Sequence, residues 1–150
     1  MSESSKELAR RYFEEVINER VLGAVGEIVA DDYVEHALAP FGQVEPGRVN
    51  GPDALRQTVG WLTAQFPDIT MTIEALVSEG DVVAVRVLSS GTNLGELNGV
   101  LPPTGRRYEA RQSHWFRVAG GKLAEHWATR EDLPVMVQLG VIEPPGRRSA

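Results

Sequence analysis

The residues best suited to proton chemistry gather where the last predicted strand ends. Residues 122–133 read Lys-Leu-Ala-Glu-His-Trp-Ala-Thr-Arg-Glu-Asp-Leu, so His126 is followed closely by two carboxylates. An imidazole titrates near neutral pH and can act as acid or base, and burial raises the pKa of a carboxylate and makes it a better base. With a histidine on the preceding predicted strand, the candidate catalytic residues are His114, His126, Glu131 and Asp132.

Each candidate also has a structural alternative. A strand histidine can be a core residue satisfied by one hydrogen bond, and Asp132, just ahead of Pro134, can cap the last helix. Arg130 shares one strand face with His126 and Ala128. There it can hold an anionic or phenolate oxygen of a ligand, or form an ion pair with a neighbouring carboxylate at the surface.

A predicted hairpin positions these side chains. Residues 108–118 and 123–129 have strand composition, and Gly120-Gly121 between them suits a tight turn. Because side chains alternate along a strand, Gln112, His114 and Phe116 share one face of the first strand, and His126 and Ala128 share one face of the second. Turning at the two glycines predicts His114 opposite Trp127. The other face is a candidate subunit interface, with Arg111, Ser113, Trp115, Arg117, Glu125 and Trp127.

Periodicity predicts the remaining elements. Apolar residues at helical spacing predict helices near 4–21, 25–29, 52–66 and 133–139, the last ended by Gly140. Alternation predicts strands at 69–77 and 82–88. Helices followed by consecutive strands indicate an α+β domain, in which a curved, mostly antiparallel sheet with helices on one face encloses a cone-shaped pocket.

Several residues are placed at this pocket. Residues 37–51 are rich in proline and glycine and predict a long loop, a kind that often serves as a lid. His36, just before it, is expected at the pocket mouth, with simple exposure as the alternative. Trp61 and Phe66 can line the pocket or pack in the core. The candidate substrate-binding residues are His36, Trp61, Phe66, Gln112, Phe116 and Arg130.

Composition narrows the functional classes. The 150 residues fit one domain, predicted over 1–142, with a mobile tail at 143–150. A net charge of −6 argues against nucleic acid as a partner. There is no cysteine, no histidine spacing typical of a metal site, no cofactor motif, no membrane-spanning apolar run and no signal-peptide pattern. A cytoplasmic protein without metal or cofactor is expected.

Several segments, in their order and spacing, resemble those of the SnoaL-like polyketide cyclases, within the cone-shaped superfamily of nuclear transport factor and scytalone dehydratase. They are Gly51-Pro-Asp-Ala-Leu-Arg, Ala64-Gln-Phe-Pro-Asp, Val77-Ser-Glu-Gly-Asp-Val-Val, Leu101-Pro-Pro-Thr-Gly-Arg-Arg and Gly121-Lys-Leu-Ala-Glu-His-Trp. The resemblance covers about residues 5–142. It implies a homodimeric, cofactor-independent enzyme acting on a hydrophobic, oxygenated, polyketide-like small molecule.

The resemblance also reveals a departure. In the family's cyclases a strand histidine faces an aspartate that directly follows His-Trp, and this aspartate is the general acid/base of an intramolecular aldol ring closure. The two positions fall on His114 and Ala128, so the resemblance implies that the strand faces carrying His114 and His126 point into the pocket. Alanine cannot transfer a proton. The resemblance therefore implies cyclisation or isomerisation by other acid/base residues, a hydroxylase-type reaction in polyketide tailoring, or a non-catalytic ligand-binding protein.

Overall fold

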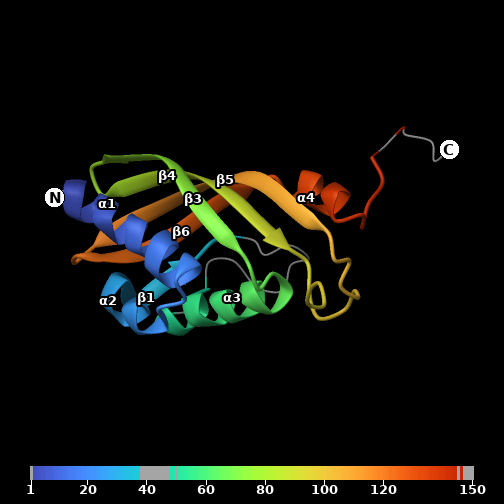
Figure 1. Ribbon diagram of the computed structural model, residues 1–150. Helices are drawn as coiled ribbons and strands as arrows, with labels where there is room; N and C mark the ends of the chain where they lie inside the picture. The colour runs from blue at the N-terminus through green and yellow to red at the C-terminus, as the bar shows by residue number, and fades with distance from the viewer. Residues whose placement is uncertain (1, 38–47, 50, 145, 147–150) are drawn as a thin grey trace.

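The computed structural model describes residues 2–37, 48–49, 51–144 and 146 (Figure 1). Its strands are β1 Val29–Glu35, β2 Arg48–Val49, β3 Thr70–Glu79, β4 Val82–Thr92, β5 Arg107–Ala119 and β6 Lys122–Arg130. Its helices are α1 Ser2–Arg11, the π-helix Tyr12–Asn18, the 3₁₀ turn Leu22–Ala24, α2 Val25–Ile28, α3 Gly51–Gln65 and α4 Asp132–Gln138. Most of the predicted lid, residues 38–47 and 50, and most of the predicted tail lie outside the described residues.

The strands form one sheet in the order β2-β1-β6-β5-β4-β3. From β3 to β6 each strand pairs antiparallel with the next, which confirms the predicted curved α+β sheet. β1 then joins the far side of β6 in parallel orientation, and β2 pairs with β1. No strand was predicted at β1, which is short, contains the adjacent Asp31 and Asp32, and pairs with a strand far along the chain.

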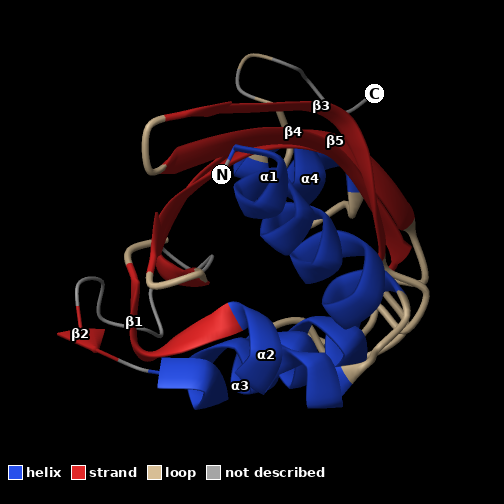
Figure 2. Ribbon diagram, turned by 90° about the vertical axis from the view of Figure 1, so that its left-hand side faces the viewer, coloured by secondary structure: helices blue, strands red, loops and turns tan. Residues whose placement is uncertain are grey.

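The helices cover the inner face of the sheet. Figure 2 shows the sheet curving around α1, with α2 and α3 closing the open side. Ala9, Phe13 and Val16 recur at helical spacing and are fully buried, as expected for an amphipathic helix that packs on a sheet. No helix in the described ranges is long and apolar enough to span a membrane.

The first helix changes its winding where it reaches the inside of the sheet. One α-helix was predicted as far as residue 21, but α1 ends at Arg11 and continues as the π-helix. Tyr12 and Ile17 both line the internal cavity and are five residues apart, the span of one π-helical hydrogen bond. The wider turn thus presents a tyrosine to the cavity.

A β-bulge sets the register of the β5–β6 hairpin. Val118 pairs with Leu123 but Arg117 pairs with Glu125, so Ala124 is the additional residue. His114 therefore lies opposite Ala128, and the predicted pairing with Trp127 is wrong by one position.

One buried asparagine fixes the connection between β4 and β5. The Oδ1 of Asn93 accepts hydrogen bonds from the backbone and the hydroxyl of Thr104 (2.9 and 3.0 Å), and its Nδ2 donates to the Gly95 carbonyl (2.8 Å). The backbone N–H groups of Leu94 and Gly95 donate to the Gln65 carbonyl at the end of α3. A Cβ at Gly95 would lie 1.7 Å from the Ala64 carbonyl oxygen, so this approach requires glycine.

Candidate functional site

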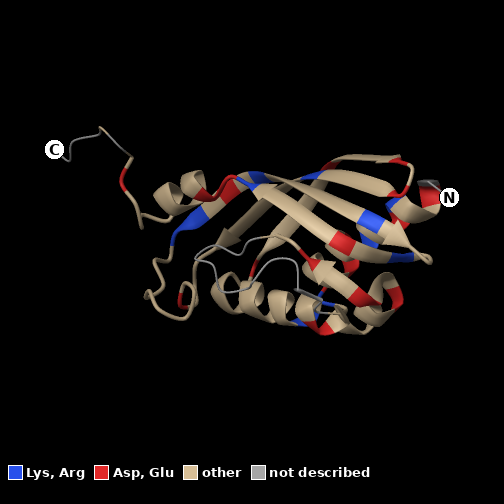
Figure 3. Ribbon diagram, turned by 180° about the vertical axis from the view of Figure 1, so that it is seen from behind, with Lys and Arg blue, Asp and Glu red and all other residues tan. Residues whose placement is uncertain are grey.

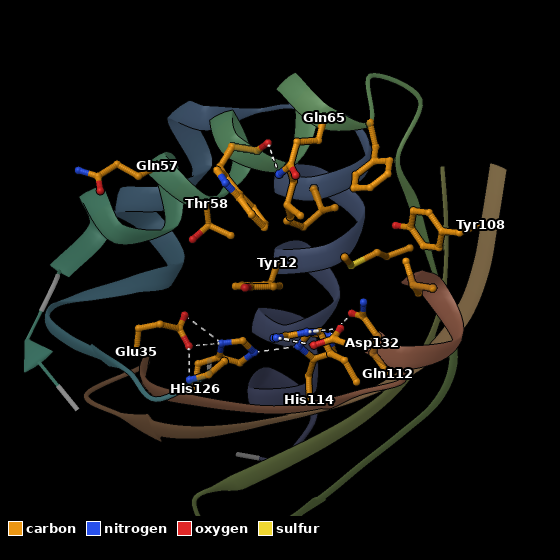
Figure 4. Close-up of a pocket in the computed structure, with 18 of the residues that line it drawn as sticks. Tyr12, Glu35, Gln57, Thr58, Gln65, Tyr108, Gln112, His114, His126 and Asp132 are labelled. Atoms are coloured by element: carbon orange, nitrogen blue, oxygen red, sulfur yellow. Dashed lines mark hydrogen bonds and ion pairs between the residues drawn. The ribbon is translucent and has the colours of Figure 1, made fainter. Parts of the chain in front are cut away.

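A cavity of about 540 Å³ lies between the inner face of β5 and β6, the helix α3 and the helix α4 (Figure 4). One wall is largely apolar and comes from α3, β3 and the connection after β4. The opposite wall is polar and comes from β1, β5, β6 and the start of α4. The polar wall consists of Glu35, Gln112, His114, His126, Arg130 and Asp132, and the apolar wall includes Trp61, Leu62, Phe66, Met71 and Leu97.

Four polar side chains form a continuous hydrogen-bonded chain on this wall. Nδ1 of His126 lies 2.8 and 3.0 Å from the two carboxylate oxygens of Glu35. Nε2 of His126 lies 2.8 Å from Nδ1 of His114, and Nε2 of His114 lies 2.7 Å from Oε1 of Gln112. We call Glu35, His126, His114 and Gln112 the relay chain.

Strand geometry explains this alignment. His114 on β5 and His126 on β6 point inward on neighbouring strands, and their rings stack 5.1 Å apart with planes only 8° from parallel. Glu35 is the register partner of His126 across the parallel β1–β6 pair. Phe13 packs edge-on against the ring of His114, with 4.9 Å between centroids. Both rings are thus held by packing, and both histidines are at least 95% buried.

The Glu35 carboxylate is fully engaged. Its Oε1 accepts the backbone N–H of Ala37 and its Oε2 accepts the hydroxyl of Tyr33, each at 2.9 Å. Burial acts to raise the pKa of Glu35, but the hydrogen bond and charge of His126, with those of Ala37 and Tyr33, outweigh burial and lower the pKa. Glu35 is therefore ionised at neutral pH.

His114 is held in its neutral form. Burial lowers the pKa of His114 well below its ordinary value, and the nearby His126 and Arg130 add to this effect. With its Nε2–H donated to Oε1 of Gln112, His114 accepts at Nδ1 from His126. Since Glu35 can only accept, this hydrogen-bond arrangement corresponds to a carboxylate–imidazolium pair behind a neutral imidazole, which is one of the two proton arrangements that the same distances fit.

Tyr12 supplies a hydrogen-bond donor in front of the relay chain. Its ring lies between the histidine pair and α3 (Figure 4), 5.6 Å from the ring of His126. Burial, reinforced by the charge of Glu35, raises the pKa of Tyr12 far above its ordinary value. The phenol therefore keeps its proton throughout the neutral range and can donate it to a ligand oxygen.

Arg130 and Asp132 form an ion pair at the end of the polar wall. The Nε and Nη2 of Arg130 donate to the two carboxylate oxygens of Asp132 at 3.1 and 3.2 Å. Asp132 is the first residue of α4, whose N-cap is Glu131, and no side chain caps the helix. The predicted capping role of Asp132 is therefore wrong, because its carboxylate is turned towards Arg130 instead.

Seven of the ten residues predicted for the site line this cavity, and three do not. His36 lies outside, where it stacks on Trp127 and bonds to Glu125 through Nε2 at 2.9 Å. Phe116 is fully buried behind the cavity, with its ring 4.8 Å from that of His126. The exposed Glu131 accepts the backbone N–H of Arg111 at 2.8 Å. The seven lining residues are Trp61, Phe66, Gln112, His114, His126, Arg130 and Asp132.

Sequence reasoning missed Glu35 and Tyr12. Tyr33 and Glu35 are two residues apart, so a strand there would have placed both on one face. Tyr12 was assigned to the buried face of the first helix, which is correct, but only the π-helix brings it to the cavity. No group of three or more His, Asp or Glu side chains in the described ranges is arranged to hold a metal ion.

Most of the chain matches one family model, and the chain is similar to several named cyclases. The model for the SnoaL-like polyketide cyclases matches residues 7–139. The nogalonic acid methyl ester cyclase of Streptomyces nogalater is 34% identical over 103 residues, which cover 68% of this chain and 72% of the relative. The aklanonic acid methyl ester cyclase DauD of Streptomyces sp. strain C5 is 30% identical over 128 residues, which cover 81% of this chain and 78% of the relative.

Solved structures share the fold over almost the full chain. IdmH of Streptomyces antibioticus, to which a polyketide cyclase activity has been attributed, is 34% identical with a TM-score of 0.76, over 92% of this chain and 99% of that one. AclR of Streptomyces galilaeus, to which a hydroxylase activity has been attributed, is 27% identical with a TM-score of 0.77. The match covers 96% of this chain and 89% of AclR.

Proposed function

Because the chain belongs to the SnoaL-like polyketide cyclase family, we propose that it catalyses the cofactor-independent ring closure of a hydrophobic, oxygenated polyketide-type substrate by acid/base chemistry. The observation that carries this proposal is the relay chain, which ends on a cavity with an apolar opposite wall. It supplies a proton-transfer group at a site where Ala128 cannot.

His114 is the catalytic residue in this proposal. When the histidine pair holds one proton fewer, His126 keeps its proton on Nδ1 towards Glu35, and the proton between the two rings lies on Nδ1 of His114. Nε2 of His114 is then a base. It removes a proton from a substrate carbon flanked by carbonyl groups, and the enolate attacks a second carbonyl carbon to close the ring.

His126 and Glu35 remove the resulting charge from the cavity. As Nε2 of His114 gains the substrate proton, its Nδ1 proton passes over the 2.8 Å bond to Nε2 of His126. The positive charge then rests on His126, beside the ionised Glu35, rather than in the cavity. The reverse shift returns a proton from His114 to the new alkoxide, so the net proton count is zero.

In this proposal, Tyr12 and Arg130 are the two donors that stabilise the enolate oxygen. The Tyr12 phenol stays protonated, and the Arg130 guanidinium is oriented by Asp132. Fixed donors of this kind stabilise developing negative charge more than mobile water does. The apolar wall, including Trp61, Phe66 and Leu97, suits the carbon skeleton of the substrate.

The proposal is tested by incubating the protein with nogalonic acid methyl ester and aklanonic acid methyl ester, the compounds in the names of the two relatives. Intramolecular ring closure gives a product of unchanged mass but altered retention and absorbance in liquid chromatography with mass detection. Conversion of either ester without added metal or cofactor supports the proposal. Tight binding of both esters without conversion would contradict it.

A second candidate is a ligand-binding protein without turnover, and the specific observation that favours it is Ala128 opposite His114. Under this candidate, Ala128→Asp is expected to create ring-closing activity on a bound ester that the native protein leaves unchanged. Under the primary proposal, the native protein is already active, and Ala128→Asp changes the rate by no more than about 10-fold, because His114 already has a proton-transfer partner. Rates of the two proteins on the same ester decide between the candidates.

The outer face of the sheet supports a homodimer. Val77, Ala84, Trp115 and Trp127 are register neighbours across four strands, and Trp115 and Trp127 are 46% and 39% exposed. Pairs such as Arg117–Glu125 border this apolar row, and charges of both signs are interspersed over the chain (Figure 3). An apolar centre with a charged rim is the usual anatomy of a protein interface.

We expect the native protein to sediment as a dimer and Trp115→Glu to sediment as a single chain, because a carboxylate at the centre of the row would lose its hydration on association. Circular dichroism serves as the control for folding. Sedimentation of the native protein as a monomer at micromolar concentration would refute this interface.

A further inference from the structure

The side chain of Gln112 is hydrogen-bonded to Nε2 of His114, the ring nitrogen that does not face His126. The two side chains are two residues apart on β5 and share its inner face, and Oε1 of Gln112 lies 2.7 Å from Nε2 of His114. Both residues line the cavity. The atom that serves as acid or base in the proposed function is thus covered by an amide in this structure.

The amide is bonded in the orientation that fits one proton state of the histidine pair. An oxygen acceptor at Nε2 requires a proton there, which makes His114 an acid and leaves the positive charge on His126. When the pair loses one proton, Nε2 of His114 has a lone pair and needs a donor instead. A carboxamide offers an acceptor on one side and a donor on the other, so a half-turn about its last bond provides either.

We propose that Gln112 is a positioning residue whose amide rotates with the proton state of the histidine pair, stabilising the acid form of His114 through Oε1 and the base form through Nε2. The catalytic importance of this rotation rests on the proposed function, but the rotation itself can be tested without any substrate. The rotation explains how Gln112 can stay hydrogen-bonded to His114 while His114 alternates between acid and base.

The other groups that face the histidine pair do not supply this exchange. Glu35 on β1 accepts only, Arg130 on β6 donates only, and Asp132 on α4 is paired with Arg130. The Tyr12 hydroxyl and the polar side chains of α3 could donate and accept, but in the described structure none of them is hydrogen-bonded to Nε2 of His114. Within the described residues, Gln112 is therefore the neighbour of Nε2 that can serve both forms.

The test is a pH titration of the ¹⁵N-labelled protein by nuclear magnetic resonance, without any substrate. In the native protein, His114 is expected to stay neutral while its proton moves from Nε2 to Nδ1 as the pair loses one proton. The side-chain amide signals of Gln112 should shift with the same midpoint. A His114 tautomer that stays the same, or Gln112 amide signals that ignore the titration, would overturn the proposal.

Two variants sharpen this test. Gln112→Glu offers a carboxylate that can only accept, so we expect loss of the tautomer change and a midpoint raised by about 1–3 pH units. Gln112→Leu, of similar size, offers neither group, and water in the cavity can then bond to Nε2 in both states. It should keep the tautomer change and a midpoint within about one unit of the native value, which makes it the control for folding.

The outcomes separate the two levels of inference. If neither ester reacts but the tautomer change is observed, the proposed function is contradicted and the role of Gln112 is still supported. A Gln112→Glu protein that titrates and switches like the native one would remove the role of Gln112, even if the native protein closes rings.

Discussion

Replacing His114 with glutamine is expected to lower kcat by about 10²–10⁴-fold, the range that general acid–base assistance contributes. Glutamine is similar in length and can still bond to His126, but it does not exchange protons near neutral pH. The apolar wall, Tyr12 and Arg130 are unchanged, so KM should stay within a few-fold of the native value. Initial rates on the ester that the native protein converts measure both constants.

The matched control is His36→Gln. The same substitution then falls on a histidine that lies outside the cavity, where it stacks on Trp127. Its kcat should equal that of the native protein. Equal loss of activity in the two variants would point to a general effect of losing a histidine, and native activity in His114→Gln would remove His114 from the mechanism.

Replacing Glu35 with glutamine is expected to destabilise the protein by about 3–5 kcal/mol at neutral pH, because it leaves one member of a buried ion pair without its partner. Glu35 is only 12% exposed and lies 2.8 Å from Nδ1 of His126. Its pKa is lower in the folded than in the unfolded chain. The stabilisation is therefore complete above the unfolded value of about 4.3 and is lost as the pH falls through the lower folded value.

Urea unfolding of native and variant protein at several pH values measures this difference. The gap between the two should be widest at neutral pH and close in acid, where the native carboxyl also becomes uncharged. Glu27→Gln is the control, since Glu27 pairs with Arg11 at the surface and its loss should cost less than about 1 kcal/mol. A gap for Glu35→Gln that stays constant with pH would show that size or packing, rather than charge, is responsible.

The sequence predicted the faces of the central hairpin better than its register. Alternation grouped His126 with Ala128 on one strand face, and the family resemblance placed that face and His114 at the pocket, where both histidines are buried. The bulge at Ala124 moved the pairing by one position, so that Ala128 and not Trp127 faces His114. Two consecutive buried residues, Leu123 and Ala124, interrupt the alternation at that point, and such an interruption is the local sign of a bulge.

Local sequence patterns could not predict contacts between distant segments of the chain. The relay chain depends on β1 lying parallel to β6, and this pairing joins segments about ninety residues apart. The sequence therefore did not identify Glu35 as a partner of His126. The spacing of Tyr33 and Glu35 is nevertheless that of two residues on one strand face. The π-helix, which directs Tyr12 into the cavity, likewise results from packing and has no sequence period of its own.

The fixed connection after β4 has a consequence for how the family can diversify. Leu97, which forms part of the apolar wall, is carried by a segment that Asn93 and Gly95 fasten to the end of α3. The histidines and Glu35 stand on the sheet and share no hydrogen bond with that segment in the described structure. Insertions and deletions between Leu97 and Thr104 can therefore resize the wall while the proton-transfer groups keep their places. In this chain, the part of the apolar wall that Leu97 forms and the groups proposed to transfer protons therefore stand on separate segments.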